Sequence, residues 1–284
     1  MRILGAYAGI RPVGLHSAMR LYPAYGESLL MKLLAPQRFK SVGHLIHGAS
    51  ELRVSIDGIV AEVRPGTSDL AMLVGVNEPL VGDWFDVRPG DIVVDVGAHI
   101  GRYTLRGARQ ASRVIAVEPD PRNFSVLERN IGLNGFSNVV AFNLALSNSK
   151  ESLPFYIARS GDTDLSSLSA NWAENLGVTS DTTPVKVDCD TLDNIVSNLA
   201  LPLITWLKID VEGHEVAVLE GSLDSLAKTE HLILELQEKN YRVCEAICER
   251  AGLKLWSVER ISGPRISYRN CLFVRATKKP IPAQ

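Results

Sequence analysis

Residues 92–101 read I-V-V-D-V-G-A-H-I-G, and this stretch decides the fold. A run of aliphatic residues contains the acid Asp95, and Gly97 and Gly101 follow it. Such a run is typical of a strand buried in a parallel sheet, and the glycines are typical of a tight turn that leads into a helix. Dinucleotide-binding proteins carry G-x-G-x-x-G here, but the third position of that pattern is His99. The imidazole leaves no room for a pyrophosphate, so we expect a smaller anionic group, such as a carboxylate, at this turn.

Strand and helix patterns alternate from Gly90 onward, and this alternation predicts a doubly wound α/β sandwich. Two late strands have no helix between them, which predicts an antiparallel edge strand on a mostly parallel, Rossmann-like sheet. The ligand site of such a sheet lies at the carboxyl ends of its strands. The predicted strands are 92–96, 114–117, 139–142, 203–210, 232–236, 255–258 and 271–275, and the predicted helices are 102–110, 121–130, 215–225 and 241–250.

Residues 1–89 are predicted to form an N-terminal cap or lid, residues 90–277 the core, and residues 278–284 a tail. Within the cap, the spacing of apolar residues predicts a helix over 17–35 that Pro23 breaks. Residues 52–63 alternate around Asp57-Gly58, which predicts a β-hairpin. Thr67 or Ser68 is then expected to cap a short helix.

Composition excludes several classes of protein. The chain has 284 residues, a net charge of −2 and no long Lys/Arg cluster, so no nucleic-acid partner is expected. No apolar run approaches the ~20 residues of a membrane span, and the N-terminus is a poor secretory signal, so the expected location is cytoplasmic. The four cysteines lack the spacing of a zinc site and are expected to be reduced core thiols.

Two acids at neighbouring strand ends suggest the ligand. Asp95 can accept a hydrogen bond from a ligand ammonium, and Glu118 ends the second strand 23 residues later. An acid at that place can take both hydroxyls of a ribose. An amino-acid head and a ribose together describe S-adenosylmethionine, although a solvated carboxylate at a strand end is the simpler interpretation of Glu118 alone. The third strand is expected to place Asn143, Ala145 and Leu146 beside the adenine, but Asn143 fits a turn residue nearly as well.

The fourth strand ends in W-L-K-I-D-V-E-G-H-E from residue 206. Lys208, Asp210 and Glu212 alternate, so they share one face while the strand persists. Charges in an otherwise buried strand are costly unless they are paired or functional. A Lys208–Asp210 ion pair would explain them structurally, and a site beside the transferred methyl group would explain them functionally.

At this point the sequence resembles the FkbM family of class I S-adenosylmethionine-dependent methyltransferases. The matching stretches are P-G-D-I-V-V-D-V-G-A-H-I-G from Pro89, V-I-A-V-E-P-D-P from Val114, L-E-R-N-I-G-L-N from Leu127, S-S-L at Ser166, T-L-D at Thr191 and L-K-I-D-V-E-G-H-E-V-A-V-L-E-G from Leu207. The likeness runs from about residue 64 to 275 and departs from the family at His214, where a small residue is expected.

The resemblance implies a methyltransferase fold and O-methylation of a hydroxyl on a sugar, polyketide or other natural product. The implied cofactor-binding residues are Asp95, Gly97, Ala98, His99, Gly101, Glu118, Pro119, Asn143, Ala145 and Asp210. Asp210 is the first candidate for the general base, beside Lys208, and Glu212, His214 and Glu235 are further candidates. Asp210 and Glu212 are equally suited to bind Mg²⁺, which takes oxygen ligands, so no metal site is assigned.

Three further features stay open. His99 is either a cofactor or substrate contact or a packed side chain of the turn. Asp69, in G-T-S-D from residue 66, is either a ligand-side residue of the lid or a helix cap. The polar insertion at 160–181 is expected to overhang the strand ends, with Leu165, Leu168 and Trp172 lining an acceptor pocket.

Other functions compete with a small-molecule O-methyltransferase. A protein or RNA methyltransferase is the first alternative, although the N/D-P-P-Y/F motif common in amino-methylating nucleic-acid enzymes is replaced here by D-V-E-G. A non-catalytic S-adenosylmethionine-binding protein is the second. An NAD-dependent oxidoreductase is the third, and the missing G-x-G-x-x-G argues against it.

Overall fold

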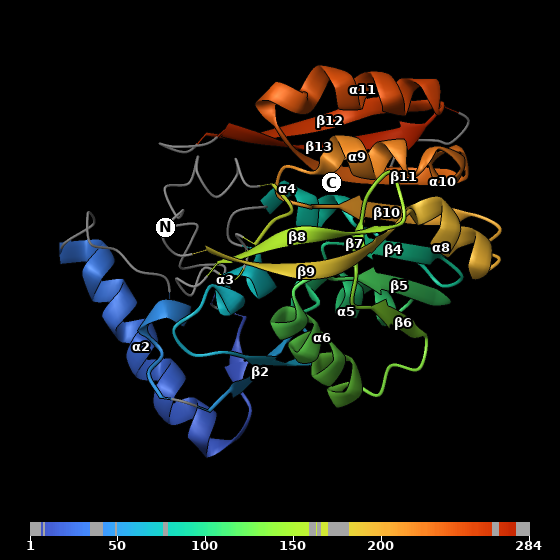
Figure 1. Ribbon diagram of the computed structural model, residues 1–284. Helices are drawn as coiled ribbons and strands as arrows, with labels where there is room; N and C mark the ends of the chain where they lie inside the picture. Colours follow the sequence, from blue (N-terminus) through green and yellow to red (C-terminus); the bar gives the residue numbers. More distant parts are fainter. Residues whose placement is uncertain are drawn as a thin grey trace.

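A computed structural model describes residues 7, 9–34, 42–48, 50–75, 79–158, 163, 166–169, 182–262 and 267–276. Its centre is a seven-stranded sheet in the order β12-β13-β11-β10-β4-β5-β6 (Figure 1). The strands are β4 (Ile92–Val96), β5 (Arg113–Val117), β6 (Val139–Phe142), β10 (Ile204–Ile209), β11 (Thr229–Gln237), β12 (Leu253–Ser262) and β13 (Ser267–Arg275). The strands from β11 to β6 pair in parallel, and β13 pairs antiparallel to both β11 and β12. The predicted fold class is therefore confirmed.

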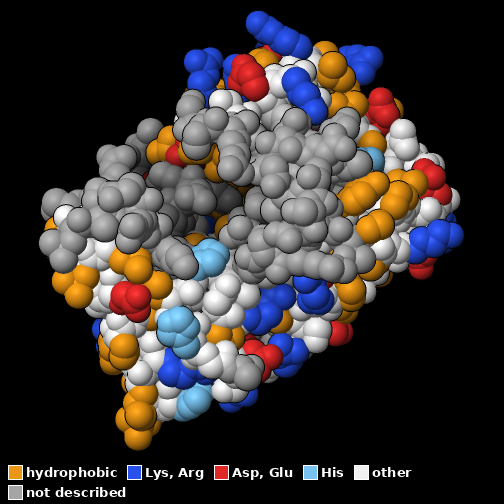
Figure 2. All heavy atoms as spheres, turned by 60° about the vertical axis from the view of Figure 1, so that its left-hand side comes forward, with side chains coloured by type: hydrophobic (Ala, Val, Ile, Leu, Met, Phe, Trp, Pro, Cys, Tyr) orange, Lys and Arg blue, Asp and Glu red, His pale blue; other side chains and the backbone are white. Residues whose placement is uncertain are grey.

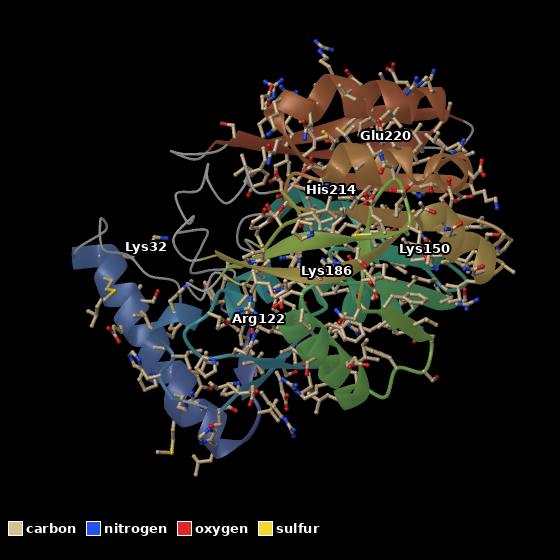
Figure 3. All side chains as sticks on the ribbon, in the orientation of Figure 1. Lys32, Arg122, Lys150, Lys186, His214 and Glu220 are labelled. Carbon is tan, nitrogen blue, oxygen red and sulfur yellow. The ribbon has the colours of Figure 1, made fainter. Side chains whose placement is uncertain are left out.

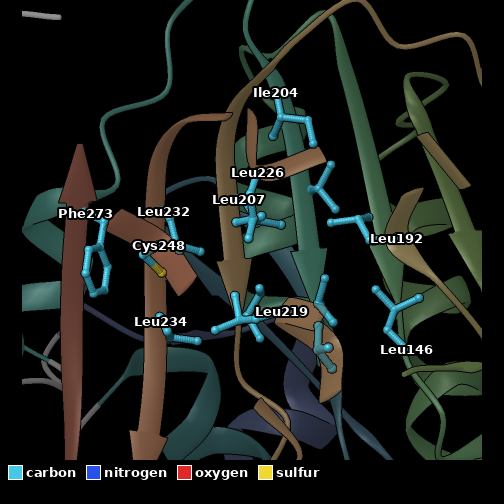
Figure 4. Close-up of a cluster of buried hydrophobic side chains, with 14 of the residues drawn as sticks. Leu146, Leu192, Ile204, Leu207, Leu219, Leu226, Leu232, Leu234, Cys248 and Phe273 are labelled. Carbon is cyan, nitrogen blue, oxygen red and sulfur yellow. The ribbon is translucent and has the colours of Figure 1, made fainter. Parts of the chain in front are cut away.

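Helices cover both faces of this sheet, as a doubly wound fold requires. On one face, apolar residues of β4, β10 and β11 form a single core with the helices of the second half of the chain; Figure 4 shows part of this core. On the other face, Val93, Trp206 and Ile233 pack against Phe85 and Tyr103. The helices of the first face are α8 (Leu192–Asn198), α9 (Glu215–Glu220), α10 (Leu223–Ala227) and α11 (Tyr241–Arg250), and those of the second are α4 (Pro79–Trp84), α5 (Arg102–Ala108) and α6 (Pro121–Leu133).

A second, three-stranded sheet follows β6. It consists of β7 (Ala145–Leu146), β9 (Thr182–Asp190) and β8 (Glu151–Ala158), in that order. Sequence analysis predicted only a polar insertion in this part of the chain. β8 and β9 flank that insertion, and Phe155, Ile157 and Val187 give them a small apolar core. Leu165 and Trp172, which were expected to line an acceptor pocket, lie outside the described residues.

The N-terminal cap contains the predicted hairpin, β2 (Leu52–Ile56) and β3 (Ile59–Val63), with both turn residues at positive φ. The short helix is α3 (Asp69–Val74), and Ser68 occupies its N-cap without a side-chain capping bond. The two-residue strand β1 (Arg11–Pro12), the helix α2 (Gly14–Leu34) and the 3₁₀ turn η2 (Gly43–Leu45) complete the cap. The predicted break at Pro23 was wrong, because α2 continues through it. Pro23 is solvent-exposed, so water can satisfy the backbone carbonyl that loses its helical partner.

Polar side chains join the cap to the core. Asn130 and Asn134 on α6 exchange hydrogen bonds with the backbone of Glu62 and Val60 on β3. An amide side chain can both donate and accept hydrogen bonds. These two side chains therefore satisfy the free edge of β3, as the backbone of a neighbouring strand would. Among the described residues, no helix combines the length and the apolar character needed to cross a membrane.

Candidate functional site

A cleft lies at the carboxyl ends of β4, β5 and β10, where the sequence predicted the ligand site. It brings together many of the predicted site residues: Gly97, His99, Glu118, Pro119, Ala145, Asp210, Glu212 and His214, with Leu146 and Leu168 among the apolar walls. Other predicted residues do not line it: Asp69, Asp95, Ala98, Gly101, Asn143, Lys208 and Glu235. A separate cavity of about 820 Å³ runs along the outer side of α5, away from these strand ends.

The glycine turn after β4 is shaped by its approach to β10. Gly97 has a φ of +77°, and a Cβ atom there would lie 1.8 Å from the carbonyl oxygen of Asp210. The backbone amides of Gly97 and Ala98 both donate to the Val117 carbonyl, and that of Gly101 donates to Ala98. These amides are therefore used inside the protein, and the expectation that the turn's amides hold a ligand carboxylate does not match the arrangement.

Glu118 is the acid best placed for a ligand hydroxyl. Glu118 is 4% exposed, and its carboxylate accepts hydrogen bonds from the His99 amide at 2.8 Å, from the Asp120 amide at 2.9 Å and from the Asn123 side chain. Burial raises the pKa of Glu118 to about 7, against the lowering effect of these hydrogen bonds. A carboxylate has about four lone-pair sites, so these contacts leave acceptor capacity for a ligand hydroxyl in the cleft.

Asn143 supports the same strand end from outside the cleft. Its side-chain amide donates to the backbone carbonyls of Glu118 at 2.8 Å and Pro119 at 3.2 Å. These bonds fit the alternative interpretation of Asn143 as a residue that fixes a turn. Asn143 therefore stabilises the strand end that carries Glu118 and does not line the cleft.

Asp95 points toward α5 and accepts from the Thr104 hydroxyl at 2.6 Å. It is 1% exposed, and within the described part of the chain its Oδ1 has no hydrogen-bond donor. Burial raises the pKa of Asp95, while the ammonium of Lys208, its register partner on β10, opposes the shift. Asp95 thus lies beside Lys208 and Thr104 and does not line the cleft.

Lys208 is 5% exposed and donates to Asp210 Oδ2 at 2.7 Å, and its ammonium lies over the Tyr103 ring. The predicted structural ion pair therefore exists. It also holds Asp210 at the cleft, beside two further acids. Carboxylate oxygens of Asp210, Glu212 and Glu235 all lie within 4.8 Å of one another, and each residue is half-buried.

The turn after β10 is held in a strained backbone conformation. Glu212 has a φ of +50°, which is uncommon for a residue with a side chain, and Gly213 follows with a φ of +98°. Ser167 donates to the Glu212 carbonyl at 2.6 Å, and Glu215 accepts from the Gly213 amide at 2.7 Å. These contacts fix the direction of the Glu212 side chain.

His214 occupies the N-cap of α9 and lines the cleft (Figure 3). Its Nε2 lies 3.1 Å from the Ser147 hydroxyl, directly after β7. Arg122, at the start of α6, donates to the Ala158 carbonyl at the end of β8. The small sheet therefore spans from α9 to α6 across the cleft. Burial lowers the pKa of His214, which keeps the imidazole neutral at physiological pH.

His99 belongs to a buried polar network, not simply to the turn. Its Nε2 lies 2.9 Å from the Thr163 hydroxyl, which donates to Asp69 Oδ1 at 2.9 Å. Asn123 donates to the Thr163 carbonyl, and the Thr163 amide donates to Ser68. Thr163 therefore connects the cap, the glycine turn and α6. We name the five residues 163 and 166–169, which cross the cleft, the strap.

The protonation state of this network follows from Asp69. Burial alone would raise the pKa of Asp69, but the paired hydrogen bonds from Arg64 outweigh it and lower the pKa. An ionised Asp69 only accepts, so the Thr163 hydroxyl must donate to it and must accept from His99. His99 therefore carries a proton on Nε2, and burial lowers its pKa to about 4, which keeps the ring neutral.

Sequence analysis missed Thr163, Arg64 and Asn123. Asp69 had been singled out from G-T-S-D, and its partner Arg64 stands five residues before it. Asp69 begins a helix that has no side-chain capping bond, and a buried acid needs a charged or hydrogen-bonding partner. This need for a partner is the only feature of the sequence that points to Arg64. The meeting of Thr163 with His99, 64 residues away, has no sequence signature.

The chain is similar to several known methyltransferases. A protein-family model described as the methyltransferase FkbM domain matches residues 95–257. Methyltransferase 1 of Beauveria bassiana is 28% identical over 202 residues, which cover 64% of this chain and 81% of the relative. The hexuronic acid methyltransferase AglP of Haloferax volcanii is 28% identical over 151 residues, 53% of this chain and 58% of the relative. The 23S rRNA (uracil(1939)-C(5))-methyltransferase RlmD of Klebsiella pneumoniae is 34% identical over 126 residues, 43% of this chain and 27% of the relative.

Proposed function

Because this chain belongs to the FkbM methyltransferase family, we propose that it transfers the methyl group of S-adenosylmethionine to a hydroxyl of a small-molecule, sugar or lipid acceptor. The observation that carries the choice of cofactor is Glu118. It is buried at the tip of β5, oriented by two backbone amides, and it lines the cleft with acceptor capacity left, which suits the hydroxyls of a ribose.

The opposite end of the cleft is suited to a cation. Asp210, Glu212 and Glu235 gather three carboxylates where Lys208 contributes one ammonium. The excess of negative charge favours the sulfonium and the ammonium of S-adenosylmethionine. The cofactor then spans the cleft, with its ribose at Glu118 and its methyl group near Asp210.

The transfer is an in-line displacement. The acceptor oxygen forms a bond to the methyl carbon while the bond from carbon to sulfur breaks, and the hydroxyl proton passes to a base. Asp210 is the first candidate because Lys208 fixes its position at the cleft. Glu212 and Glu235 lie within reach of the same place, and His214 is neutral and thus able to accept a proton. Alignment of oxygen, methyl and sulfur supplies most of the acceleration.

Magnesium is a second use for the same carboxylates. Mg²⁺ takes oxygen ligands from one or two carboxylates and from water, and Asp210, Glu212 and Glu235 offer such oxygens. In that case the ion would orient the acceptor hydroxyl, and Asp210 would act as a ligand instead of as the base. Both roles belong to the same proposed transfer.

Two observations favour a small acceptor over RNA. The chain carries a net charge of −2, whereas RNA binding depends on neutralising phosphates. One of its relatives is a hexuronic acid methyltransferase, and its match spans more of this chain than the match to the rRNA methyltransferase does. A protein or RNA acceptor stays the alternative, and a cytoplasmic location stays a prediction.

The test combines binding with transfer. We expect S-adenosylhomocysteine to bind the purified chain and labelled S-adenosylmethionine to pass its methyl group to the small-molecule fraction of an extract. Glu118→Gln should weaken binding by about 10-fold or more, since it removes the charge that the ribose hydroxyls approach. The matched control is Glu249→Gln, an exposed acid on α11. Binding without transfer would support the non-catalytic alternative, and label in RNA or protein would replace the small acceptor.

A further inference from the structure

The helix α2 carries apolar residues on two opposite sides. One side packs against the rest of the cap through Leu21, Ala24 and the half-buried Met31. A second set lies on the opposite side, where Gly26 is half-buried and the other members are exposed, and we name it the outer stripe: Leu15, Met19, Tyr22, Gly26, Leu29, Leu30 and Leu33. Its six large side chains are between 38% and 77% exposed. Figure 1 shows α2 at the lower left, away from the central sheet, and Figure 2 shows apolar side chains along that border.

The spacing of the outer stripe is that of a helix-pairing seam. Leu15, Met19, Tyr22, Gly26, Leu29 and Leu33 follow one another at intervals of four, three, four, three and four residues. Apolar residues alternating at three and four positions form the contact face of two helices that lie side by side. A continuous exposed stripe of this kind marks an interaction surface more often than a chance grouping.

Gly26 is the odd member of the stripe. Glycine in a helix interior lowers helix stability by about 1 kcal/mol relative to alanine, so a glycine at this position indicates a packing or functional role. A Cβ atom added to Gly26 would meet no described atom within 4 Å beyond its own helix, so the space above it is open. Tyr22, one turn earlier, projects a 63% exposed ring beside that space. The stripe thus carries one large protrusion and one gap.

We propose that a second copy of this chain packs its α2 against the outer stripe in an antiparallel, two-fold symmetric pair. Antiparallel pairing centred at position 24 sets Tyr22 against Gly26 of the second copy, and Gly26 against Tyr22. The same symmetry sets Leu15 against Leu33 and Met19 against Leu29, so every contact recurs in reverse. A parallel pair would oppose the two tyrosines and leave the two glycines facing each other.

The area of the stripe agrees with a reversible dimer. Six large side chains at roughly 100 Å² each present about 600 Å² per copy, against ~800 Å² per partner in a standard interface. A lipid surface is the other natural partner for an apolar helix face. A lipid surface would bind more tightly to a helix with a large apolar residue at position 26. The second copy instead requires the space at Gly26, because its Tyr22 occupies that space.

The experiment measures self-association of the full chain by sedimentation velocity from about 1 to 200 µM. We expect the wild type to dimerise with a Kd of the order of micromolar. Gly26→Tyr should fill the gap and weaken the dimer by about 100-fold. The double change Tyr22→Gly with Gly26→Tyr exchanges protrusion and gap, and it should restore the Kd to within about 10-fold of the wild type.

Controls separate this result from unfolding and from lipid binding. Glu27→Gln lies on α2 outside the stripe and should leave the Kd unchanged, and circular dichroism checks that each variant keeps its helix content. Flotation with anionic vesicles tests the lipid surface, for which Gly26→Tyr would bind better than the wild type. A wild type that stays monomeric to about 200 µM, or a Gly26→Tyr variant that dimerises as well as the wild type, would overturn the proposal.

Discussion

Replacing Thr163 by valine tests the buried network that joins the cap, the glycine turn and the strap. Valine keeps the shape of threonine, so the change removes a hydroxyl without opening a cavity. Thr163 is 6% exposed and Asp69 fully buried, so solvent cannot take over their hydrogen bond. Its loss costs about 1.5–3 kcal/mol because the acceptor is charged, and the Nε2 proton of His99 left without an acceptor adds about 1–3 kcal/mol.

We expect Thr163→Val to lower the free energy of unfolding by about 3 kcal/mol, near the lower end of that sum because neighbours in a network relax. Thr163→Ser keeps the hydroxyl and loses one methyl group, at a cost of about 1 kcal/mol. Urea unfolding of the two variants and the wild type, followed by fluorescence with the slope m held in common, measures the difference. If the valine and serine variants unfold within about 0.5 kcal/mol of each other, the network contributes nothing and our assignment of its protons is wrong.

Three further predictions concern the cleft. Because the pKa of Glu118 is raised to about 7, the folded chain holds a proton there that the unfolded chain releases near 4.5, so its contribution to stability falls as pH rises from about 4.5 to 7. Binding of S-adenosylhomocysteine should then release a proton and strengthen from pH 6 to 8, and titration calorimetry in buffers of different ionisation enthalpy should detect no release in Glu118→Gln. Gly97→Ala should destabilise by more than about 3 kcal/mol, whereas Gly58→Ala, with a φ of +80° and open space, should cost only the ~1–2 kcal/mol of the backbone; equal losses would remove the contact with Asp210 as the cause. Asp210→Asn should abolish transfer. EDTA should inhibit the wild type only if a metal ion takes part, and full activity of the variant would exclude Asp210 from both roles.

Much of the fold followed from local patterns. The strands β4, β5 and β10 are buried on both faces, so their apolar runs are long and leave little choice of element. The turns that begin α6 and the hairpin carry residues whose backbone preferences act within a few positions, such as Asp120 as a cap with Pro121 after it. The helix from Pro121 and the hairpin were predicted, and the structure confirms them.

The features that escaped prediction depend on contacts across the chain. A proline such as Pro23 breaks a helix when the backbone carbonyl that it leaves without a partner is buried. The solvent exposure of that carbonyl cannot be seen in the sequence. Asp95 was expected to face the ligand, but the register of β4 against β10 turns it toward Thr104 and Lys208. β8 and β9 were missed because each is stabilised mainly by the other. The roles assigned to the cleft residues stay predictions until a ligand is bound.

The contact of Gly97 with Asp210 bears on whether a glycine turn in a genome sequence indicates methyltransferase activity. The glycine is required by the carbonyl oxygen of Asp210, which belongs to the protein itself, and not by a bound molecule. A descendant that no longer handled a methyl donor would still be obliged to keep this glycine in order to fold. The glycine turn therefore reports descent and architecture, and the loss of activity would first appear elsewhere, at side chains that line the cleft, such as that of Asp210.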